Sequence, residues 1–359
     1  MRSLFRRALI LYGVGMMPLQ ALAAPLVARV APTHESRFVP ANIEEKAPLQ
    51  LAVIGDSVLW GQGLREKDKS SHDVQEWLAK RLHRPVYRTV YAHSGASIGE
   101  TDSQLAPSVG EVPQGSPSVT QQVAGARSPE TVDVLLLNGC INDVPASKIV
   151  LGSIHSPNWH KVATTACYQP VKRLLRQTLV RFPKAIVIFA GYYPFYTQTQ
   201  PGTHILRAIG DALLCADEPE GSDCRERNDA VPAPGVVRSK AWHEGSNDAI
   251  RKAIDEIQGE FPSRKIAFAP VSFAIDDGYG SADSKLWHLG EHDDVRSQRL
   301  DACRDSKNAA PKGWKQRYGL SCTQASTLHP NRGGARLYTR SMRKQLSILV
   351  PALDAPVSK

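Results

Sequence analysis

The sequence has no internal repeat and no low-complexity tract, and its basic residues are not gathered into runs. The lack of a repeat argues against solenoid and propeller architectures. Lysine and arginine outnumber aspartate and glutamate by 44 to 35, but because they are dispersed they do not favour nucleic-acid binding. With 359 residues, 42% of them hydrophobic and 22% charged, the chain can bury a core in one large domain or two small ones.

A membrane-spanning apolar run is also missing from the N-terminus. The basic MRSLFRR is followed by the apolar stretch ALILYGVGMMPLQ and then by ALA at 21–23, a small-x-small cleavage site. This order is typical of a secretory signal, and its apolar part is too short to cross a bilayer, which argues against a retained anchor. We expect residues 1–23 to be a signal peptide, the mature protein to be secreted or periplasmic, and no stable membrane span to remain after cleavage.

Cysteine is scarce, with six residues in the chain, yet exported proteins commonly pair the few cysteines they have. The sequence alone permits several pairings. Proximity along the chain favours the bridges Cys215–Cys224 and Cys303–Cys322, which leaves Cys140–Cys167 as the third pair.

Short apolar runs alternate with segments of helical spacing from residue 49 onward, after an irregular lead-in at 24–48 that holds several prolines. The apolar runs predict buried strands, and the segments between them predict helices. The predicted strands are 49–55, 86–93, 131–139, 184–193 and 264–273, and the predicted helices are 70–83, 163–182, 247–261 and 333–350.

Nearly continuous apolar strands separated by helices indicate a parallel sheet covered on both faces. We therefore predict a single α/β domain at 49–351 with three layers, α/β/α, around a parallel sheet of five strands. Two stretches, 194–245 and 274–328, break the alternation and hold four of the six cysteines. Because loops of this length often carry function, we interpret them as disulfide-bearing insertions around a site rather than as a second domain.

The first insertion contains a segment, 202–215, whose apolar residues share one helical face. Such a helix is typically packed on the core. The alternative is a lid over an acyl-chain pocket, since lids of this kind commonly close sites.

The stretch LAVIGDSVLWGQG at 51–63 places Ser57 directly after the first predicted strand. In an open parallel sheet, ligands bind beyond the carboxyl ends of the strands, so Ser57 lies where a nucleophile could meet a substrate. A serine hydroxyl needs a base to take its proton, usually histidine, and an acyl-transfer intermediate needs donors aimed at its oxyanion. The same residues are also compatible with an ordinary strand-to-helix turn.

The ends of other predicted elements supply these groups. The second strand ends in AHSGAS, with Gly95, and the third ends in LLLNGCINDV, with the side-chain amide of Asn142. The segment STLHPNRGGA places His329 just before the last helix. Each feature alone also has a structural explanation, as a turn or a helix N-cap. Their common place at one edge of the predicted sheet favours catalysis.

This order of motifs resembles the SGNH (GDSL-type) hydrolase superfamily of esterases and lipases. The resembling blocks are GDSVLWGQG, the glycine of HSGAS, the Asn-Asp of GCINDV and the His-Pro of LHPN. The resemblance implies a flavodoxin-like sheet, with Ser57 as nucleophile and His329 as base. It also implies the Ser57 amide, Gly95 and Asn142 as oxyanion donors. Position 59 is Leu59, so the serine is not in a G-x-S-x-G elbow, which argues against the α/β-hydrolase fold.

Two positions depart from the superfamily pattern. Cys140 stands where the third block usually has glycine, and Ser326 stands where an aspartate usually precedes the histidine by three residues. Without that acid, the histidine lacks its usual orienting partner. Either a backbone carbonyl or Ser326 holds the ring, or an acid comes from elsewhere, with Asp301 and Asp305 as candidates.

A competing motif, HLGEH at 288–292, matches the H-x-x-E-H pattern of zinc proteases. On a helix, His288 and His292 would share a face, as two zinc ligands must. Gly290 and the lack of an amphipathic surrounding favour surface or pocket-rim histidines instead.

The sequence therefore predicts a secreted serine esterase or lipase. Its partner would be an ester substrate (a lipid, an acylated polysaccharide or a small ester) and not a nucleic acid. This chemistry requires no metal or organic cofactor. Two alternatives use the same fold: an acyltransferase on the same site, and a non-catalytic secreted binding protein that kept the fold.

Overall fold

The computed structural model describes residues 29–41, 47–99, 117–144, 149, 158–197, 233–301 and 324–352. The predicted signal peptide at 1–23, the predicted helix at 202–215 and the predicted bridges Cys215–Cys224 and Cys303–Cys322 lie outside these residues. None of the helices within the described ranges is long and apolar enough to cross a bilayer.

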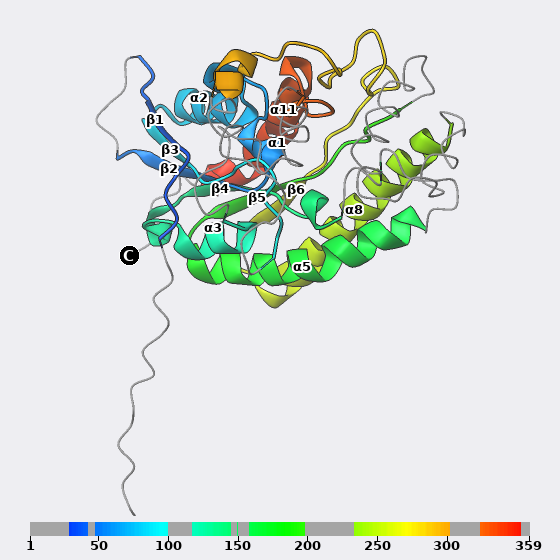
Figure 1. Cartoon of the computed structure of the whole chain (residues 1–359). Coiled ribbons are helices and arrows are strands. Elements are labelled where there is room, and N and C mark those ends of the chain that lie inside the picture. Colours follow the sequence, from blue (N-terminus) through cyan, green and yellow to red (C-terminus); the bar gives the residue numbers. More distant parts are fainter. Residues whose placement is uncertain are drawn as a thin grey trace, which may run out of the picture.

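A six-stranded sheet forms the centre of the fold (Figure 1). Its strands are β1 (His34–Phe38), β2 (Leu49–Ile54), β3 (Val86–Val90), β4 (Val134–Leu137), β5 (Ile186–Ala190) and β6 (Ile266–Ala269). Their order across the sheet is β1-β3-β2-β4-β5-β6. The strands β2 to β6 are parallel, and their order is that of a flavodoxin-like sheet whose topological switch lies between β2 and β4. The predicted five-stranded parallel sheet is confirmed.

The sixth strand, β1, corrects the prediction of an irregular lead-in over 24–48. It pairs antiparallel with β3, with His34 opposite Val90 and Phe38 opposite Val86. Its sequence HESRF holds one apolar residue, so no apolar run marks it. An edge strand needs no such run, because one of its sides is unpaired and charged residues are favoured there.

Helices cover both faces of the sheet. The main helices are α1 (Ser57–Trp60), α2 (Ser70–Leu82), α3 (Val119–Gly125), α5 (Trp159–Arg181), α8 (Ala233–Glu260) and α11 (Arg332–Leu349). Figure 1 shows α2 and α11 on one face of the sheet and α3, α5 and α8 on the other. The predicted three-layer α/β/α arrangement is therefore confirmed.

The structure extends two predicted helices and adds a third. The helix α5 begins at Trp159 rather than at 163, and α8 begins at Ala233 rather than at 247, so α8 takes in the end of the predicted insertion at 194–245. The helix α3 has no predicted counterpart. Its start does have a sequence signal, because Ser118 and Gln121 form a capping box.

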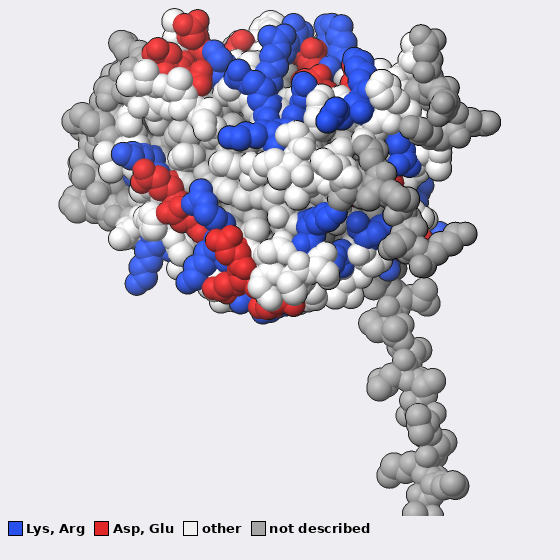
Figure 2. Space-filling view, turned by 180° about the vertical axis from the view of Figure 1, so that it is seen from behind, with Lys and Arg blue, Asp and Glu red and all other residues white. Residues whose placement is uncertain are grey.

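The charged residues lie in separate groups on the surface. Figure 2 shows lysine and arginine side chains in several places on one face of the molecule, with aspartate and glutamate between them. This agrees with the dispersed charge of the sequence, which gives a net charge of +9 without a basic run.

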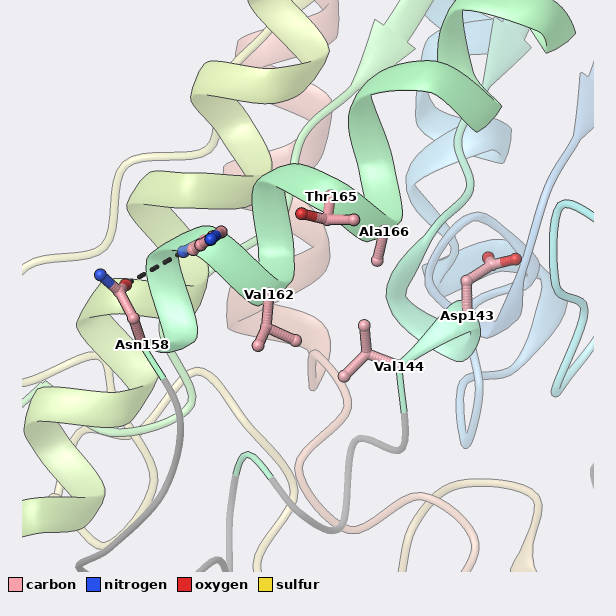
Figure 3. Close-up of a pocket in the computed structure, with 7 residues that line it drawn as sticks. Asp143, Val144, Asn158, Val162, Thr165 and Ala166 are labelled. Atoms are coloured by element: carbon pink, nitrogen blue, oxygen red, sulfur yellow. Dashed lines mark hydrogen bonds between the residues drawn. The ribbon is translucent and has the colours of Figure 1, made fainter.

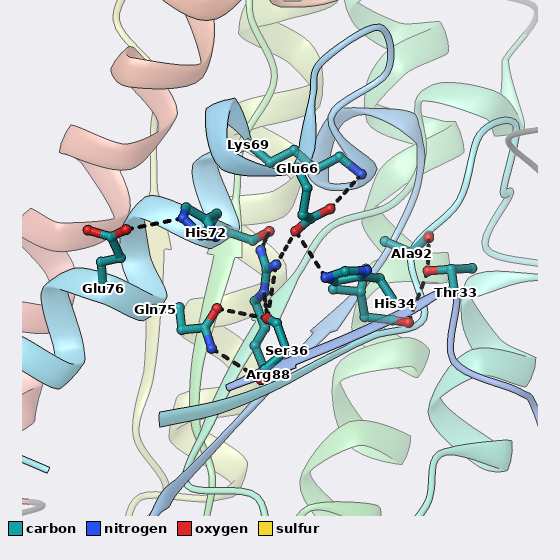
Figure 4. Close-up of polar contacts among 12 residues, drawn as sticks. Thr33, His34, Ser36, Glu66, Lys69, His72, Gln75, Glu76, Arg88 and Ala92 are labelled. Atoms are coloured by element: carbon teal, nitrogen blue, oxygen red, sulfur yellow. Dashed lines mark hydrogen bonds and ion pairs between the residues drawn. The ribbon is translucent and has the colours of Figure 1, made fainter. Parts of the chain in front are cut away.

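A buried arginine joins the edge of the sheet to the helix layer (Figure 4). Arg88 on β3 is 1% exposed, and its guanidinium pairs with Glu66 in the turn before α2. The same guanidinium donates to Ser71 Oγ at 2.8 Å and to Ser36 Oγ at 3.2 Å, which connects α2 and β1. Burial would raise the pKa of Glu66, but the positive charges of Lys69 and Arg88 hold it below its ordinary value.

Replacing Glu66 by glutamine removes the negative charge that faces the buried Arg88 guanidinium. We expect Glu66→Gln to lower the free energy of unfolding by about 2 kcal/mol, less than for a fully buried pair because the Glu66 side chain is one-third exposed. Urea denaturation followed by circular dichroism measures the change. The control, Glu76→Gln, breaks an exposed pair with Lys80 and should cost under about 0.5 kcal/mol. Equal losses in the two variants would contradict the prediction.

Candidate active site

The predicted nucleophile follows a turn in which one position, Gly55, has room only for glycine. The strand β2 leads into α1 through Gly55 and Asp56, and Ser57 is the first residue of α1. A Cβ atom on Gly55 would lie 1.8 Å from Asn138 Oδ1, which excludes a larger residue. The Gly55 backbone is fixed at both ends, since its N–H donates to Gln122 Oε1 at 2.9 Å and its carbonyl accepts from Gln122 Nε2 at 3.1 Å.

Asp56, which sequence reasoning missed as a site residue, holds this turn from within the core. Its Oδ1 accepts hydrogen bonds from Val58 N at 2.9 Å and from Asn138 Nδ2 at 2.8 Å. Its Oδ2 accepts a hydrogen bond from Tyr192 OH at 2.5 Å. Burial raises the pKa of Asp56, and these three hydrogen bonds oppose the rise. Because Asn138 follows β4 and Tyr192 follows β5, one carboxylate ties the turn to the ends of two other strands.

Ser57 and His329 are 272 residues apart in the sequence and meet in the structure. The distance from Ser57 Oγ to His329 Nε2 is 2.8 Å. His329 Nδ1 lies 3.3 Å from the Thr327 carbonyl, which can only accept. We therefore assign the ring proton to Nδ1, which leaves Nε2 able to accept the Ser57 proton. Of the alternatives that the sequence left open, the group facing Nδ1 is a backbone carbonyl.

The protonation state of His329 suits a base. Removal of the ring from water lowers its pKa to about 4. Hydrogen bonding with the backbone of Thr327 and Ser326 opposes this shift, the positive charge of Arg299 adds to it, and the negative charge of Asp293 opposes it. At neutral pH the ring is uncharged, which is the form that can take a proton.

Part of the predicted insertion at 274–328 holds the segment before His329. Leu328 N donates to Trp287 O at 3.0 Å, and Trp287 N donates to His329 O at 2.9 Å. From the sheet side, Tyr193 OH donates to Leu328 O at 2.8 Å. These contacts fix the backbone that directly follows the Thr327 carbonyl and carries the ring of His329.

The loops that carry Gly95 and Asn142 follow β3 and β4, the two strands that flank β2. Gly95 has a φ of +78°, a conformation that favours glycine. Asn142 Nδ2 donates to Ala96 O at 2.9 Å, so the two loops are joined at the carboxyl edge of the sheet. This is the edge on which the Ser57 turn lies. The role of Gly95 and Asn142 as oxyanion donors stays a prediction.

The predicted Cys140–Cys167 bridge is confirmed, and it joins the turn η3 (Ile141–Asp143) to α5 with the two Cα atoms 5.3 Å apart. Cys140 has a φ of +113°, in the range that favours glycine, at the position where the resembling superfamily usually has glycine. On the other side, Ile141 N donates to Tyr192 OH at 3.3 Å. The bridge and this hydrogen bond fix the turn that carries Asn142.

The HLGEH segment does not form a helix. His288 N donates to Glu291 Oε2 at 2.7 Å, and Gly290 has a φ of +80°, as in a turn. His288 and His292 therefore do not share a helical face, and the zinc-protease interpretation lacks its structural context. Among the residues that the structure describes, no group of three or more His, Cys, Asp or Glu side chains is placed to hold a metal ion.

A groove of about 480 Å³ lies between η3 and the first turns of α5 (Figure 3). One of its lining residues is Asp143, which follows Asn142 in the sequence. Figure 3 shows the side chains of Val144 and Val162 facing one another across it. The groove is mainly apolar, with polar groups from the start of α5, and its lining residues are Asp143, Val144, Asn158, Lys161, Val162, Thr165 and Ala166.

No protein-family model and no curated protein matches the sequence. Solved structures similar to this chain include an extracellular lipase from Streptomyces rimosus, 14% identical with a TM-score of 0.46, covering 83% of this chain and 99% of that one. Phospholipase A1 from Streptomyces albidoflavus NA297 is 13% identical, with a TM-score of 0.44 and coverage of 83% and 100%. The lipase Lip_vut3 from a goat rumen metagenome is 14% identical, with a TM-score of 0.44 and coverage of 83% and 97%.

The low pKa of His329 can be measured directly. We expect the ring to titrate near pH 4, because its removal from water disfavours the charged form. Proton NMR of the histidine ring signals, assigned by their loss in His329→Gln, gives the midpoint. A midpoint near about 6.5, the ordinary value for histidine, would contradict the prediction.

Proposed function

We propose that this protein is a carboxylic ester hydrolase in which Ser57 is the nucleophile and His329 is the base. The observation that carries the proposal is the 2.8 Å contact between Ser57 Oγ and His329 Nε2, with Nδ1 turned to the Thr327 carbonyl. A neutral histidine that accepts the proton of a serine hydroxyl is what nucleophilic catalysis requires. The pair also lies at the carboxyl edge of a parallel sheet, where such sheets bind ligands.

In the acylation step, Ser57 Oγ attacks the carbonyl carbon of the ester while its proton passes to His329 Nε2. The carbonyl oxygen becomes an oxyanion, and the backbone N–H groups of Ser57 and Gly95 and the amide of Asn142 are the donors proposed to stabilise it. The tetrahedral intermediate then collapses, the alcohol leaves with the proton from His329, and the acyl group stays on Ser57.

Deacylation repeats these steps with water as the nucleophile. His329 takes a proton from the water as its oxygen attacks the acyl carbon. It then returns the proton to Ser57 Oγ as the carboxylic acid is released. The histidine is therefore positively charged in both transition states, so groups that stabilise the imidazolium increase the rate.

The groove beside Asp143 supports an ester with an apolar chain as the substrate. Its volume of about 480 Å³ lies in the usual range for small-molecule sites, and its valine walls would contact a hydrocarbon chain. One of its lining residues, Asp143, is the sequence neighbour of Asn142, and this groove is the proposed position of the acyl chain. Together with the predicted export, this favours a lipid, an acylated polysaccharide or a small ester found outside the cytoplasm.

Loss of either member of the pair should abolish turnover. We expect Ser57→Ala and His329→Ala to lower kcat for p-nitrophenyl esters, acetate through palmitate, by about 10⁴-fold or more. The controls are Ser347→Ala and His292→Ala, both at exposed positions, which should keep the wild-type rate. Wild-type turnover in Ser57→Ala would overturn the assignment, and loss of turnover in His292→Ala would favour a role for HLGEH.

Filling the groove should change selectivity for chain length. We expect Val162→Trp to raise KM for p-nitrophenyl octanoate by about tenfold while leaving p-nitrophenyl acetate within about twofold of wild type. The control is Val180→Trp on the same helix, where the side chain is 74% exposed, and it should leave both esters unchanged. An equal effect of Val162→Trp on both esters would show that the groove does not hold the acyl chain.

A further inference from the structure

Ser326 contacts a carboxylate that sequence reasoning did not find. The hydroxyl of Ser326 donates to Asp293 Oδ2 at 2.6 Å, and the carbonyl of Ser326 accepts from His329 N at 2.9 Å. Both Ser326 and Asp293 are buried. The Asp293 carboxylate therefore contacts the turn before His329 through the Ser326 hydroxyl, although the residue three positions before the histidine is itself a serine.

The Asp293 carboxylate is itself fixed from several directions. It forms an ion pair with Arg299, and both side chains are fully removed from solvent. Its Oδ1 also accepts from Val295 N at 3.1 Å. Because each polar contact of Asp293 restricts its carboxylate, Ser326 Oγ meets an acceptor that has little freedom to move.

The segment after the nucleophile encloses the same contact. Gly63, with a φ of +84°, lies so close that a Cβ atom on it would be 2.6 Å from the Ser326 Cβ and 3.2 Å from the Asp293 Cβ. The turn that follows Ser57 and α1 therefore packs directly on Ser326 and Asp293. This packing places the hydroxyl–carboxylate contact between the loop of the nucleophile and the loop of the base.

The two buried charges act on the histidine with opposite signs. Arg299 disfavours the charged ring and Asp293 favours it. A neutral residue at position 293 would remove a negative charge that favours the protonated His329 ring, and the opposing effect of Arg299 would remain. The charge of Asp293 therefore bears on the transition state as well as on the resting structure.

We propose that Asp293 and Ser326 are positioning residues that together take the place of the missing triad acid. Asp293 fixes the Ser326 hydroxyl, and Ser326 in turn fixes the turn whose Thr327 carbonyl orients His329 Nδ1. The carboxylate also balances Arg299 when the imidazolium forms. This inference rests on the proposed ester hydrolysis and adds to it the residues that orient and stabilise its base.

The deciding variant is Ser326→Ala, which removes the hydroxyl and leaves the Asp293–Arg299 pair intact. We expect kcat for p-nitrophenyl butyrate to fall about tenfold with KM unchanged, and Tm to fall by only a few degrees, since one buried hydrogen bond to a charged group is lost while the fold is kept. The control is Asp294→Asn, which removes a carboxylate one residue away that pairs with Arg332, and it should keep the wild-type kcat.

A rescue variant separates a positioning role from a structural one. The exchange Asp293→Ser with Ser326→Asp moves the carboxylate next to the histidine turn, and we expect it to restore kcat to within about threefold of wild type. A wild-type kcat in Ser326→Ala, or a folded exchange variant no faster than Ser326→Ala, would overturn the inference alone. No turnover by the wild type would overturn the proposed function, and the inference with it.

Discussion

The buried carboxylate of Asp56 is the interaction on which the arrangement of the site depends. It accepts hydrogen bonds from the first turn of α1, from Asn138 after β4 and from Tyr192 after β5. Tyr192 OH in turn accepts from Ile141 N, at the start of the turn that carries Asn142. One carboxylate therefore connects the position of Ser57 with that of the proposed oxyanion loop, and its burial makes any lost partner costly.

The strands could be predicted from the sequence because each inner strand is an apolar run, and their parallel direction follows from the helices between them. The bounds of β2 to β6 differ from the predicted ones by only a few residues. The edge strand β1 could not be found in this way, because HESRF has neither an apolar run nor a strong β pattern. The early start of α8 was missed because the residues before 247 were grouped with a long insertion.

The site was predictable where it lies in short motifs at strand ends. Ser57 and His329 meet as the motifs predict, and the pairing of Cys140 with Cys167 follows from the other cysteines being neighbours. The partners of the histidine were not predictable. Every residue has a backbone carbonyl, so the sequence does not mark the one of Thr327 as the partner of His329. Asp293 lies in an irregular segment, and only the folded chain brings it to Ser326. Sequence reasoning named Asp301 and Asp305 as candidate acids and not Asp293, and Asp305 lies outside the described residues.

The central claim is that the Ser57 hydroxyl is an activated nucleophile. The most direct measurement is the intact mass of the mature protein after exposure to a fluorophosphonate, followed by peptide mapping of the adduct. We expect one adduct, on Ser57, which is absent in Ser57→Ala and forms far more slowly in His329→Ala. A folded protein that gains no adduct on Ser57, or that labels at the same rate without His329, would contradict it.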